Sequence, residues 1–420
     1  MHIFLSILEN VLLVLNVAVA IYGIYFLALG IMCLFFRPKK SHSDQINRFA
    51  LVIAARNERE VIGNLIDSLK KLDYPKDMYD IYVVPNNCTD DTEEVARAHG
   101  ALIYKCEQPV KMKADALSQV FDYLLESEKN YDAFCVFDAD NLVDKNFLLA
   151  MNDSYNCGSN IAQGFRDAKN PHDSWISGSY AVYYYCVNSF MSKARRAIGM
   201  SAYINGTGFM VSSRLIRKLG FNTYTLTEDN EYSIQCILEG EKVEYVPDAI
   251  VYDEHPVTMG VSFKQRLRWS KGLISCCHIY TGSLIKCCLK KQRSSALDAI
   301  LFSFGPVIQI VALFFAGLTI LLAWLNVISL RIIMLQNIQL FALLTLLMVI
   351  FFPMLTAVLA GITNGKKPGA LKQAIVAFPL FIITWLPINI VALFDRKQTW
   401  EPVKHTSNIS MAELTEKTNV

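Results

Sequence analysis

Long apolar runs near both ends of the chain are the feature that most limits what it can fold into. Residues 11–36, VLLVLNVAVAIYGIYFLALGIMCLFF, contain no charged side chain. A helix of that length spans roughly 39 Å, enough to cross the hydrocarbon core of a bilayer with some tilt. The run is too long for a signal peptide, and Met1 to Asn10 carry no Lys or Arg. We therefore expect residues 1–37 to form a retained transmembrane anchor.

The last third of the chain repeats this signal. Residues 299–330 and 332–362 are two apolar runs, and a third run over 373–394 follows the basic loop GKKPGALKQ. We expect residues 298–396 to form a C-terminal transmembrane region with two spans. The third run is either a further span or a re-entrant segment, because Pro379 and Pro387 suit a broken helix.

The positive charges beside these runs predict their orientation. Cytoplasmic loops of membrane proteins carry an excess of Lys and Arg. The first run is followed by Arg37, Lys39 and Lys40, and the third has basic residues on both flanks, including Arg396 and Lys397 before the tail at 397–420. We expect an integral protein of the plasma (cell inner) membrane whose middle part, residues 38–272, is a cytoplasmic domain.

Residues 273–297 are expected to form an amphipathic helix in the lipid headgroup region. Apolar side chains recur there at helical spacing, and basic side chains gather at the C-terminal end. The apolar set is Leu273, Cys277, Tyr280, Leu284 and Cys288, and the basic set is Lys286, Lys290, Lys291 and Arg293.

The middle part reads as an α/β domain. Apolar runs at 49–54, 80–84, 101–104 and 133–137 alternate with helical patterns such as 113–125. This alternation predicts a parallel, doubly wound sheet. The hydrophobic content of 53% excludes a disordered chain, and the net charge of +2 gives no argument for a nucleic-acid partner.

Polar clusters follow three of the expected strands: ARNERE, PNNCTDD and DADN. Ligands of such sheets bind at the carboxyl ends of the strands, so these clusters predict the site. The next helix, TEEVARAHG, has Thr89 or Asp90 as its expected cap. The chain has no GxGxxG and no Walker A loop, which argues against the usual dinucleotide and ATP phosphate cradles.

Asp138 and Asp140 leave a buried strand two residues apart. Two such carboxylates repel one another unless a cation joins them, and a hard divalent ion on a diphosphate is the natural occupant. Taken alone, the pair is better explained as a solvated turn beside Asn141.

Two further clusters carry chemistry. Thr227, Glu228 and Asp229 precede a helical pattern, and taken alone they are better explained as a helix cap than as a general base. The segment QRLRWSKG offers the bidentate fork of Arg268 and the aromatic face of Trp269, which suit a phosphate and a sugar. A basic collar at the membrane surface is the alternative.

In order and spacing, these clusters resemble the motifs of the membrane-bound, processive branch of family-2 glycosyltransferases, which includes cellulose, hyaluronan and chitin synthases and poly-N-acetylglucosamine synthases. The resemblance covers residues 48–272. It rests on ARNE (55–58), NNCTDD (86–91), KADAL (113–117), DAD (138–140), GTG (206–208), TED (227–229) and QRLRW (265–269).

The resemblance implies a GT-A fold, a nucleotide-diphosphate sugar donor and inverting transfer. Asp229 would be the base, with Glu228 assisting it, and Asp138 and Asp140 would hold Mg²⁺ or Mn²⁺ on the diphosphate. The other implied donor-binding residues are Ala55, Asn57, Glu58, Asn86, Lys113 and Arg268. The implied acceptor-binding residues are Gly206, Thr207, Gly208, Gln265 and Trp269.

Asn86 departs from the family pattern, which has an acidic residue there to read uracil. An amide can also pair with a uracil edge, because it offers both a donor and an acceptor, so UDP is the expected nucleotide. His255 could ligate a metal as in some GT-A enzymes, although a satisfied loop histidine is favoured.

The expected activity is transfer of a hexose or N-acetylhexosamine to a growing polysaccharide or lipid-linked acceptor at the bilayer. One alternative is a single transfer to a membrane lipid. A non-enzymatic sensor of nucleotide sugars and a haloacid-dehalogenase-like phosphotransferase are more remote. The latter usually needs Asp-x-Asp-x-Thr, and Leu142 stands where the Thr would be.

Overall fold

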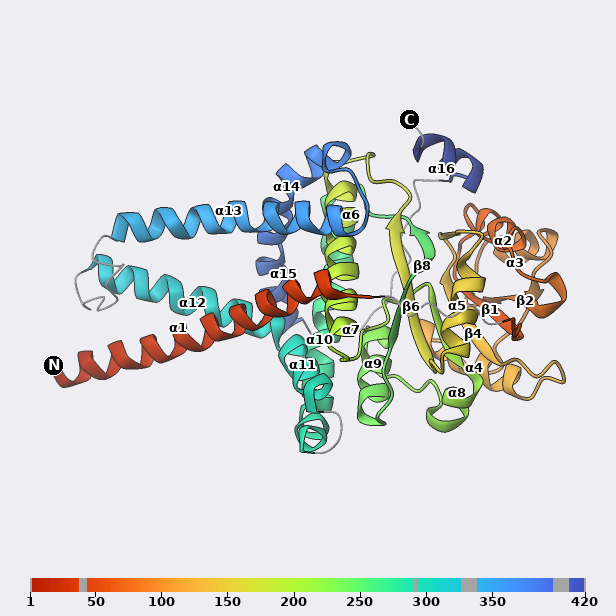
Figure 1. Cartoon of the computed structure of the whole chain (residues 1–420), viewed down its shortest axis with the longest axis horizontal. Coiled ribbons are helices and arrows are strands. Elements are labelled where there is room, and N and C mark those ends of the chain that lie inside the picture. The colour runs from red at the N-terminus through yellow and green to blue at the C-terminus, as the bar shows by residue number, and fades with distance from the viewer. Residues whose placement is uncertain (1, 38–43, 290–292, 326–337, 396–407, 419–420) are drawn as a thin grey trace.

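The computed structural model of the chain describes residues 2–37, 44–289, 293–325, 338–395 and 408–418. A compact α/β domain lies at one end, and long helices extend from it at the other (Figure 1). Several residues used above fall outside the described ranges, namely Lys39, Lys40, Lys290, Lys291, Arg331, Arg396 and Lys397.

The domain is built on an eight-stranded sheet with the order β3-β2-β1-β4-β7-β6-β8-β5. The strands are β1 (Phe49–Ala55), β2 (Tyr79–Pro85), β3 (Leu102–Ile103), β4 (Ala133–Asp138), β5 (Leu142–Val143), β6 (Ile161–Ala168), β7 (Phe209–Ser212) and β8 (Glu244–Asp253). The first four in this order are parallel, as the sequence predicts. The prediction of a wholly parallel sheet is wrong, because β7 pairs antiparallel with both β4 and β6.

Both faces of the parallel half are covered, which explains its continuous apolar runs. Along β1, Phe49, Leu51 and Ile53 pack on one side, while Ala50 and Val52 pack on the other. The covering helices of the domain are α2 (Ile62–Lys70), α3 (Thr92–Ala98), α4 (Lys113–Leu125), α5 (Phe147–Asn156), α8 (Ser213–Leu219) and α9 (Glu228–Leu238).

Of the two caps expected for α3, Asp90 is confirmed as the residue that bonds the first helical N–H, and Thr89 is not. The residue before the helix is Asp91, and its side chain makes no capping hydrogen bond. The carboxylate of Asp90 instead accepts a hydrogen bond of 3.2 Å from the backbone N–H of Thr92. Thr89 is held by Asn57, whose side-chain oxygen accepts from the Thr89 N–H at 2.7 Å.

The remaining helices include the long apolar segments of the chain. They are α1 (His2–Ile31), α6 (Trp175–Cys186), α7 (Ala194–Ala197), α10 (Met259–Cys288), α11 (Arg293–Ser303), α12 (Gly305–Trp324), α13 (Ile338–Thr363), α14 (Lys372–Ile383), α15 (Trp385–Phe394) and α16 (Met411–Thr418). Among the described residues, three helical segments are long and apolar enough to cross a membrane: Ser6–Phe35, Gly305–Leu322 and Pro368–Phe394. In Figure 1, α1, α12 and α13 extend along the long axis of the molecule.

The third apolar run does not follow that direction. It breaks into α14 and α15 at Thr384. In Figure 1 both helices run from the top of the view towards the bottom, across the direction of α13. On one flank, Lys366 pairs with Asp167 of the domain at 2.5 Å. On the other, Asp395 pairs with Lys271 of α10 at 2.6 Å. A segment with both flanks beside the same domain cannot separate them by a bilayer, so we infer a re-entrant or interfacial arrangement.

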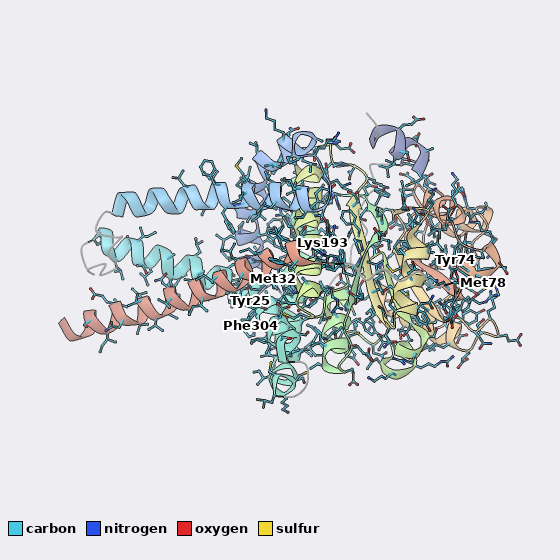
Figure 2. All side chains as sticks on the ribbon, viewed as in Figure 1. Tyr25, Met32, Tyr74, Met78, Lys193 and Phe304 are labelled. Atoms are coloured by element: carbon cyan, nitrogen blue, oxygen red, sulfur yellow. The ribbon has the colours of Figure 1, made fainter. Side chains whose placement is uncertain are left out.

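Buried polar contacts fix the domain to the long helices. The guanidinium of Arg195 and the carboxylate of Asp298 are fully buried and bonded at 2.7 Å, and the hydroxyl of Tyr25 on α1 donates to Asp298 at 2.8 Å. Lys193 donates to the carbonyl of Thr363 at 2.7 Å, at the end of α13. Figure 2 labels Tyr25 and Lys193 at this junction, and Tyr74 and Met78 at the opposite side of the domain.

Helix α10 runs without a break through residues 272 and 273, where the sequence suggested a domain boundary. Its expected lipid face is partly wrong, because Leu284 is buried with Cys276 and Cys287 against α9 and α11. The exposed apolar side chains are instead Ile279 and Ile285. Apolar spacing along a helix identifies a buried stripe but not which neighbour covers it.

Candidate active site

A cavity of about 1160 Å³ lies at the carboxyl ends of β1, β2 and β4. Because β7 runs antiparallel to β4, the loop before β7 opens at this same edge. The cavity therefore collects residues from distant parts of the sequence. The predicted site residues that line it are Glu58, Asn86, Lys113, Asp138, Asp140, Gly206, Glu228, Asp229, Gln265, Arg268 and Trp269.

The other predicted residues lie behind this lining. Ala55 is buried and its carbonyl accepts from the backbone N–H of Asn86 at 2.9 Å. Thr207 is buried, accepts a hydrogen bond of 3.0 Å from the Asp138 N–H, and donates to Asn141. At Gly208 an added Cβ would lie 2.5 Å from Val251 Cγ1. These residues and Asn57 therefore support the residues that line the cavity rather than lining it themselves.

Lys113 links the acidic clusters. Its ammonium lies 2.5 Å from Asp138 Oδ1, 2.7 Å from the Gly206 carbonyl and 3.9 Å from Glu228 Oε1. Burial lowers the pKa of Lys113, but the carboxylates of Asp138 and Glu228 outweigh it and raise the pKa. Burial likewise acts to raise the pKa of Asp138, and the charges of Lys113 and Arg166 lower it overall. Both groups are therefore charged at neutral pH, and Lys113 is held by two carboxylates and a backbone carbonyl.

Asp229 begins α9 at the wall of the cavity. Burial, followed by the charge of Glu228, raises its pKa from 3.8 to about 6. Gly206 faces this carboxylate, since a Cβ added there would lie 3.3 Å from Asp229 Oδ2. The backbone of Gly206 has a φ of 82°, which favours glycine, so the loop leaves open space in front of Asp229. A carboxyl group with a pKa near 6 suits a general base at neutral pH.

The cap explanation for the TED segment is not supported. Thr227 stands at the position before α9, but its side chain makes no capping hydrogen bond. It packs instead against α10, where a Cβ added at Gly272 would lie 2.8 Å from Thr227 Cβ. Arg268 of α10 donates to the carbonyl of Leu226 at 3.0 Å. Helix α10 thus holds the start of α9 in place from two points.

The two arginines of QRLRW have different surroundings. Arg268 lines the cavity, whereas Arg266 is fully buried and donates to the Phe381 carbonyl at 3.2 Å and to Thr384 Oγ1 at 2.8 Å. Trp269 forms a three-ring cluster with Tyr183 and Trp385, with centroids 6.1 Å and 6.2 Å away, and those two rings are 5.9 Å from each other. Arg268 of this segment therefore lines the cavity, and Arg266 contacts the break between α14 and α15.

The sequence interpretation missed Arg166 and Asp253, which also line the cavity. Arg166 Nε donates to Asp253 Oδ2 at 3.0 Å, and its Nη1 donates to the carbonyl of Asn205 at 2.6 Å. Asn141 donates to the other oxygen of Asp253 at 2.8 Å, which ties the Asp-x-Asp turn to β8. The signal available in the sequence was an arginine near the end of a largely apolar run, IAQGFRDA. This run forms β6, and all of it is buried.

His255 is stacked on Tyr184 and Tyr180, with ring centroids 5.1 Å and 5.5 Å away. Burial lowers its pKa to about 4, so the ring is neutral. Its Nε2 is buried and has no hydrogen-bond partner within the described part of the chain. The expectation of a satisfied loop histidine is therefore wrong for this nitrogen.

Asp138 and Asp140 both line the cavity and offer the oxygen ligands that Mg²⁺ and Mn²⁺ prefer. The described residues contain no group of three or more His, Cys, Asp or Glu side chains arranged to hold a metal without further help. This donor set fits an ion that also binds the oxygens of a diphosphate.

Asn86 is buried at the end of β2, and its Nδ2 donates to the Ala55 carbonyl at 3.1 Å. This contact fixes the amide against β1. The side-chain oxygen of Asn86, Oδ1, suits a hydrogen-bond donor on the edge of a nucleobase.

Known proteins are similar to this domain in sequence and in fold. The β-monoglucosyldiacylglycerol synthase of Nostoc sp. is 27% identical over 259 residues, covering 58% of this chain and 53% of that protein. The poly-β-1,6-N-acetyl-D-glucosamine synthase of Staphylococcus aureus is 24% identical over 234 residues, covering 54% and 55%. The chain thus spans about half the length of these curated relatives.

Among solved structures, the mannosyltransferase PcManGT of Pyrobaculum calidifontis, in complex with GDP-Man and Mn²⁺, superposes with a TM-score of 0.61 at 17% identity. The superposition covers 93% of this chain and 100% of that one, and it shows the shared GT-A fold. The profile described as "Glycosyltransferase like family 2" matches residues 47–272, which is more than half of the chain. The chain therefore belongs to glycosyltransferase family 2, and it is a glycosyltransferase with a GT-A domain flanked by apolar helices.

Proposed function

We propose that this glycosyltransferase works at the cytoplasmic face of the membrane and transfers a hexose or N-acetylhexosamine from a nucleotide-diphosphate sugar with inversion. The observation that carries the proposal is the convergence of Asp138, Lys113, Glu228 and Asp229 on one cavity beside the membrane helices. Membership of the family indicates the class of reaction, and the arrangement of charges in the cavity supports a role for each residue.

Asp229 acts as the base that removes a proton from the acceptor hydroxyl. Its raised pKa of about 6 lets it take up that proton near neutral pH. Glu228, through its charge, contributes to the raised pKa and orients Lys113. The hydroxyl oxygen attacks the anomeric carbon from the side opposite the diphosphate, and this displacement inverts the configuration.

The donor binds at the carboxyl ends of β1, β2 and β4. Asp138 and Asp140 hold Mg²⁺ or Mn²⁺, which neutralises the diphosphate when it is bound. Arg268, from α10, stabilises the charge of the departing nucleoside diphosphate, because a guanidinium pairs well with phosphate. Asn86 and Glu58 line the nucleotide end of the cavity, and the preferred donor is a UDP-sugar.

The acceptor is either a growing glycan or a membrane lipid. Trp269 and Trp385 offer flat aromatic faces beside the cavity, which suit a sugar ring. The relatives compared above are named for both kinds of product, a glycolipid and a polysaccharide.

The test is incubation of the purified full-length protein with a panel of radiolabelled UDP- and GDP-sugars, Mn²⁺ and membrane lipids. Transfer that depends on the metal and is lost in Asp229→Asn supports the proposal. Binding of a nucleotide sugar with no turnover under any condition would favour a non-enzymatic sensor. Equal transfer by Asp229→Asn would remove the assigned base.

A further inference from the structure

The cavity continues beyond the carboxylates into the membrane-facing helices. At one end it is lined by Asp138 and Asp229, and at the other by Gln309 of α12 with Phe352 and Thr356 of α13. Its volume of about 1160 Å³ exceeds the range of roughly 300–1,000 Å³ for a site that holds one small ligand. The space beyond the donor site therefore belongs to the acceptor.

The far end is apolar. Beyond the two tryptophans its lining includes Val187, Phe190, Met191, Phe302, Phe378 and Ile382. The polar groups there already bond within the chain, since Gln309 Oε1 accepts from Asn389 at 2.8 Å and the Thr356 hydroxyl donates to the Pro353 carbonyl at 2.8 Å. A glycan would bury several hydroxyls without partners in this space, whereas a hydrocarbon chain would be stabilised by it.

The apolar end also reaches the surface of the helices. Phe352 lines the cavity and is 43% exposed on α13. Val349, one turn before it on α13, is 41% exposed. The helix extends with α1 and α12 away from the domain (Figure 1), and its exposed apolar surface suits contact with lipid. A lipid can therefore enter the cavity sideways with its chains still in the membrane.

The catalytic end indicates which lipid head fits. Glu228 and Asp229 stand together there, the nearby ammonium of Lys113 is already paired with Asp138, and Arg268 is assigned to the leaving diphosphate, so an anionic phosphate acceptor is disfavoured. A phosphate would also need no base, because it is already ionised. An uncharged hydroxyl has the opposite properties, since it needs a base and tolerates the two carboxylates.

Building on the proposed glycosyl transfer, we propose that the acceptor is a neutral membrane lipid with a free hydroxyl, whose acyl chains occupy the apolar end of the cavity between α12 and α13. The lipid hydroxyl oxygen forms the new bond to the anomeric carbon. The bond from that carbon to the diphosphate oxygen breaks, and the proton passes to Asp229. The products are a glycolipid with one added sugar and a nucleoside diphosphate.

The test uses the full chain in nanodiscs with the labelled donor that gives the most nucleotide release. Three acceptors are compared: dioleoylglycerol, undecaprenyl phosphate and a soluble oligosaccharide. Thr356→Trp fills the apolar end, and Leu355→Trp places the same bulk on the outward-facing side of α13, where Leu355 is 54% exposed and does not line the cavity. Nucleotide-sugar hydrolysis by water is measured in parallel because it reports donor chemistry without an acceptor.

We expect a chloroform-soluble product with one sugar from dioleoylglycerol. Thr356→Trp should lower this transfer at least tenfold relative to hydrolysis, while Leu355→Trp retains the wild-type ratio. Use of only undecaprenyl phosphate, a water-soluble polymer made without added lipid, or equal transfer by Thr356→Trp would each overturn the lipid assignment. Absence of both donor binding and hydrolysis in the wild type would instead overturn the proposed function. Binding of the nucleoside diphosphate to each variant shows that it is folded.

Discussion

Replacing Asp229 by Asn separates catalysis from stability, since the two should change in opposite directions. Burial raises the pKa of Asp229 from 3.8 to about 6, so the folded protein holds this group in its charged form at a cost. A shift of this size corresponds to about 3 kcal/mol at a pH well above 6, as an upper value because Glu228 shares the charge.

The sign follows from linkage. A carboxyl group whose pKa is raised by folding favours the folded state only while it is protonated, and this contribution is lost as pH rises through about 6. An Asn side chain is always neutral and has nearly the same shape. Asp229→Asn should therefore be more stable than the wild type at pH 8, by up to about 3 kcal/mol, and this gain should fall to roughly half at pH 5 and vanish below a pH of about 3.8.

The assay is thermal unfolding of the detergent-solubilised protein in EDTA at pH 5 and pH 8, together with turnover under standard conditions. For a domain of this size the gain at pH 8 would raise Tm by about 5 °C or more. Turnover should fall at least 100-fold, the lower limit of what a positioned base contributes. In the wild type, kcat/KM should decline as pH falls below about 6.

Asp122→Asn is the matched control, because Asp122 lies on the exposed face of α4. It should alter neither Tm nor turnover. A loss of stability in Asp229→Asn at pH 8 would show that the carboxylate is held by favourable contacts, and the reasoning from burial would be refuted. Retained turnover would refute its role as the base.

Other substitutions test the remaining parts of the site. Lys113→Ala leaves Asp138 without its cation, so unfolding in EDTA should require about 1–3 kcal/mol less, and added Mn²⁺ should restore part of the loss; no response to Mn²⁺ would argue against a metal at Asp138. Gly272→Ala forces α10 away from Thr227 and should cost about 1–3 kcal/mol in thermal unfolding and reduce turnover, whereas an unchanged enzyme would show that the contact is soft. Arg266→Ala should lower Tm clearly because two buried hydrogen bonds are lost, while Arg268→Ala should remove turnover with a smaller change in Tm; the reverse pattern would contradict the two assigned surroundings.

Some elements of the fold follow from local sequence patterns, and others depend on distant contacts. Helix α4 begins and ends at the residues expected, Lys113 and Leu125, because its pattern and both flanks are local. Thr227 shows the opposite case, since a Ser or Thr before a helix usually caps it, but here the side chain packs on Gly272 of a helix more than forty residues away. Local rules fail where a distant element supplies the contact.

The antiparallel insertion of β7 between β4 and β6 is a second case. Short apolar strands do not reveal the direction in which they pair, and FMVS reads equally well either way. This direction places Gly206 opposite Asp229 and brings its carbonyl within 2.7 Å of Lys113. The motif was visible in the sequence, but its geometry was not.

The sequence by itself determined the segments apolar enough to span a membrane, the α/β class and the family, because apolar run lengths, strand–helix alternation and spaced motifs are all local features of the chain. The tertiary structure alone decided that Arg166 and Asp253 join the site and that Leu284 faces the protein. It also decided that the cavity extends to α13. Each of these depends on which surfaces of distant elements meet, and that is set by packing of the whole molecule rather than by any local pattern.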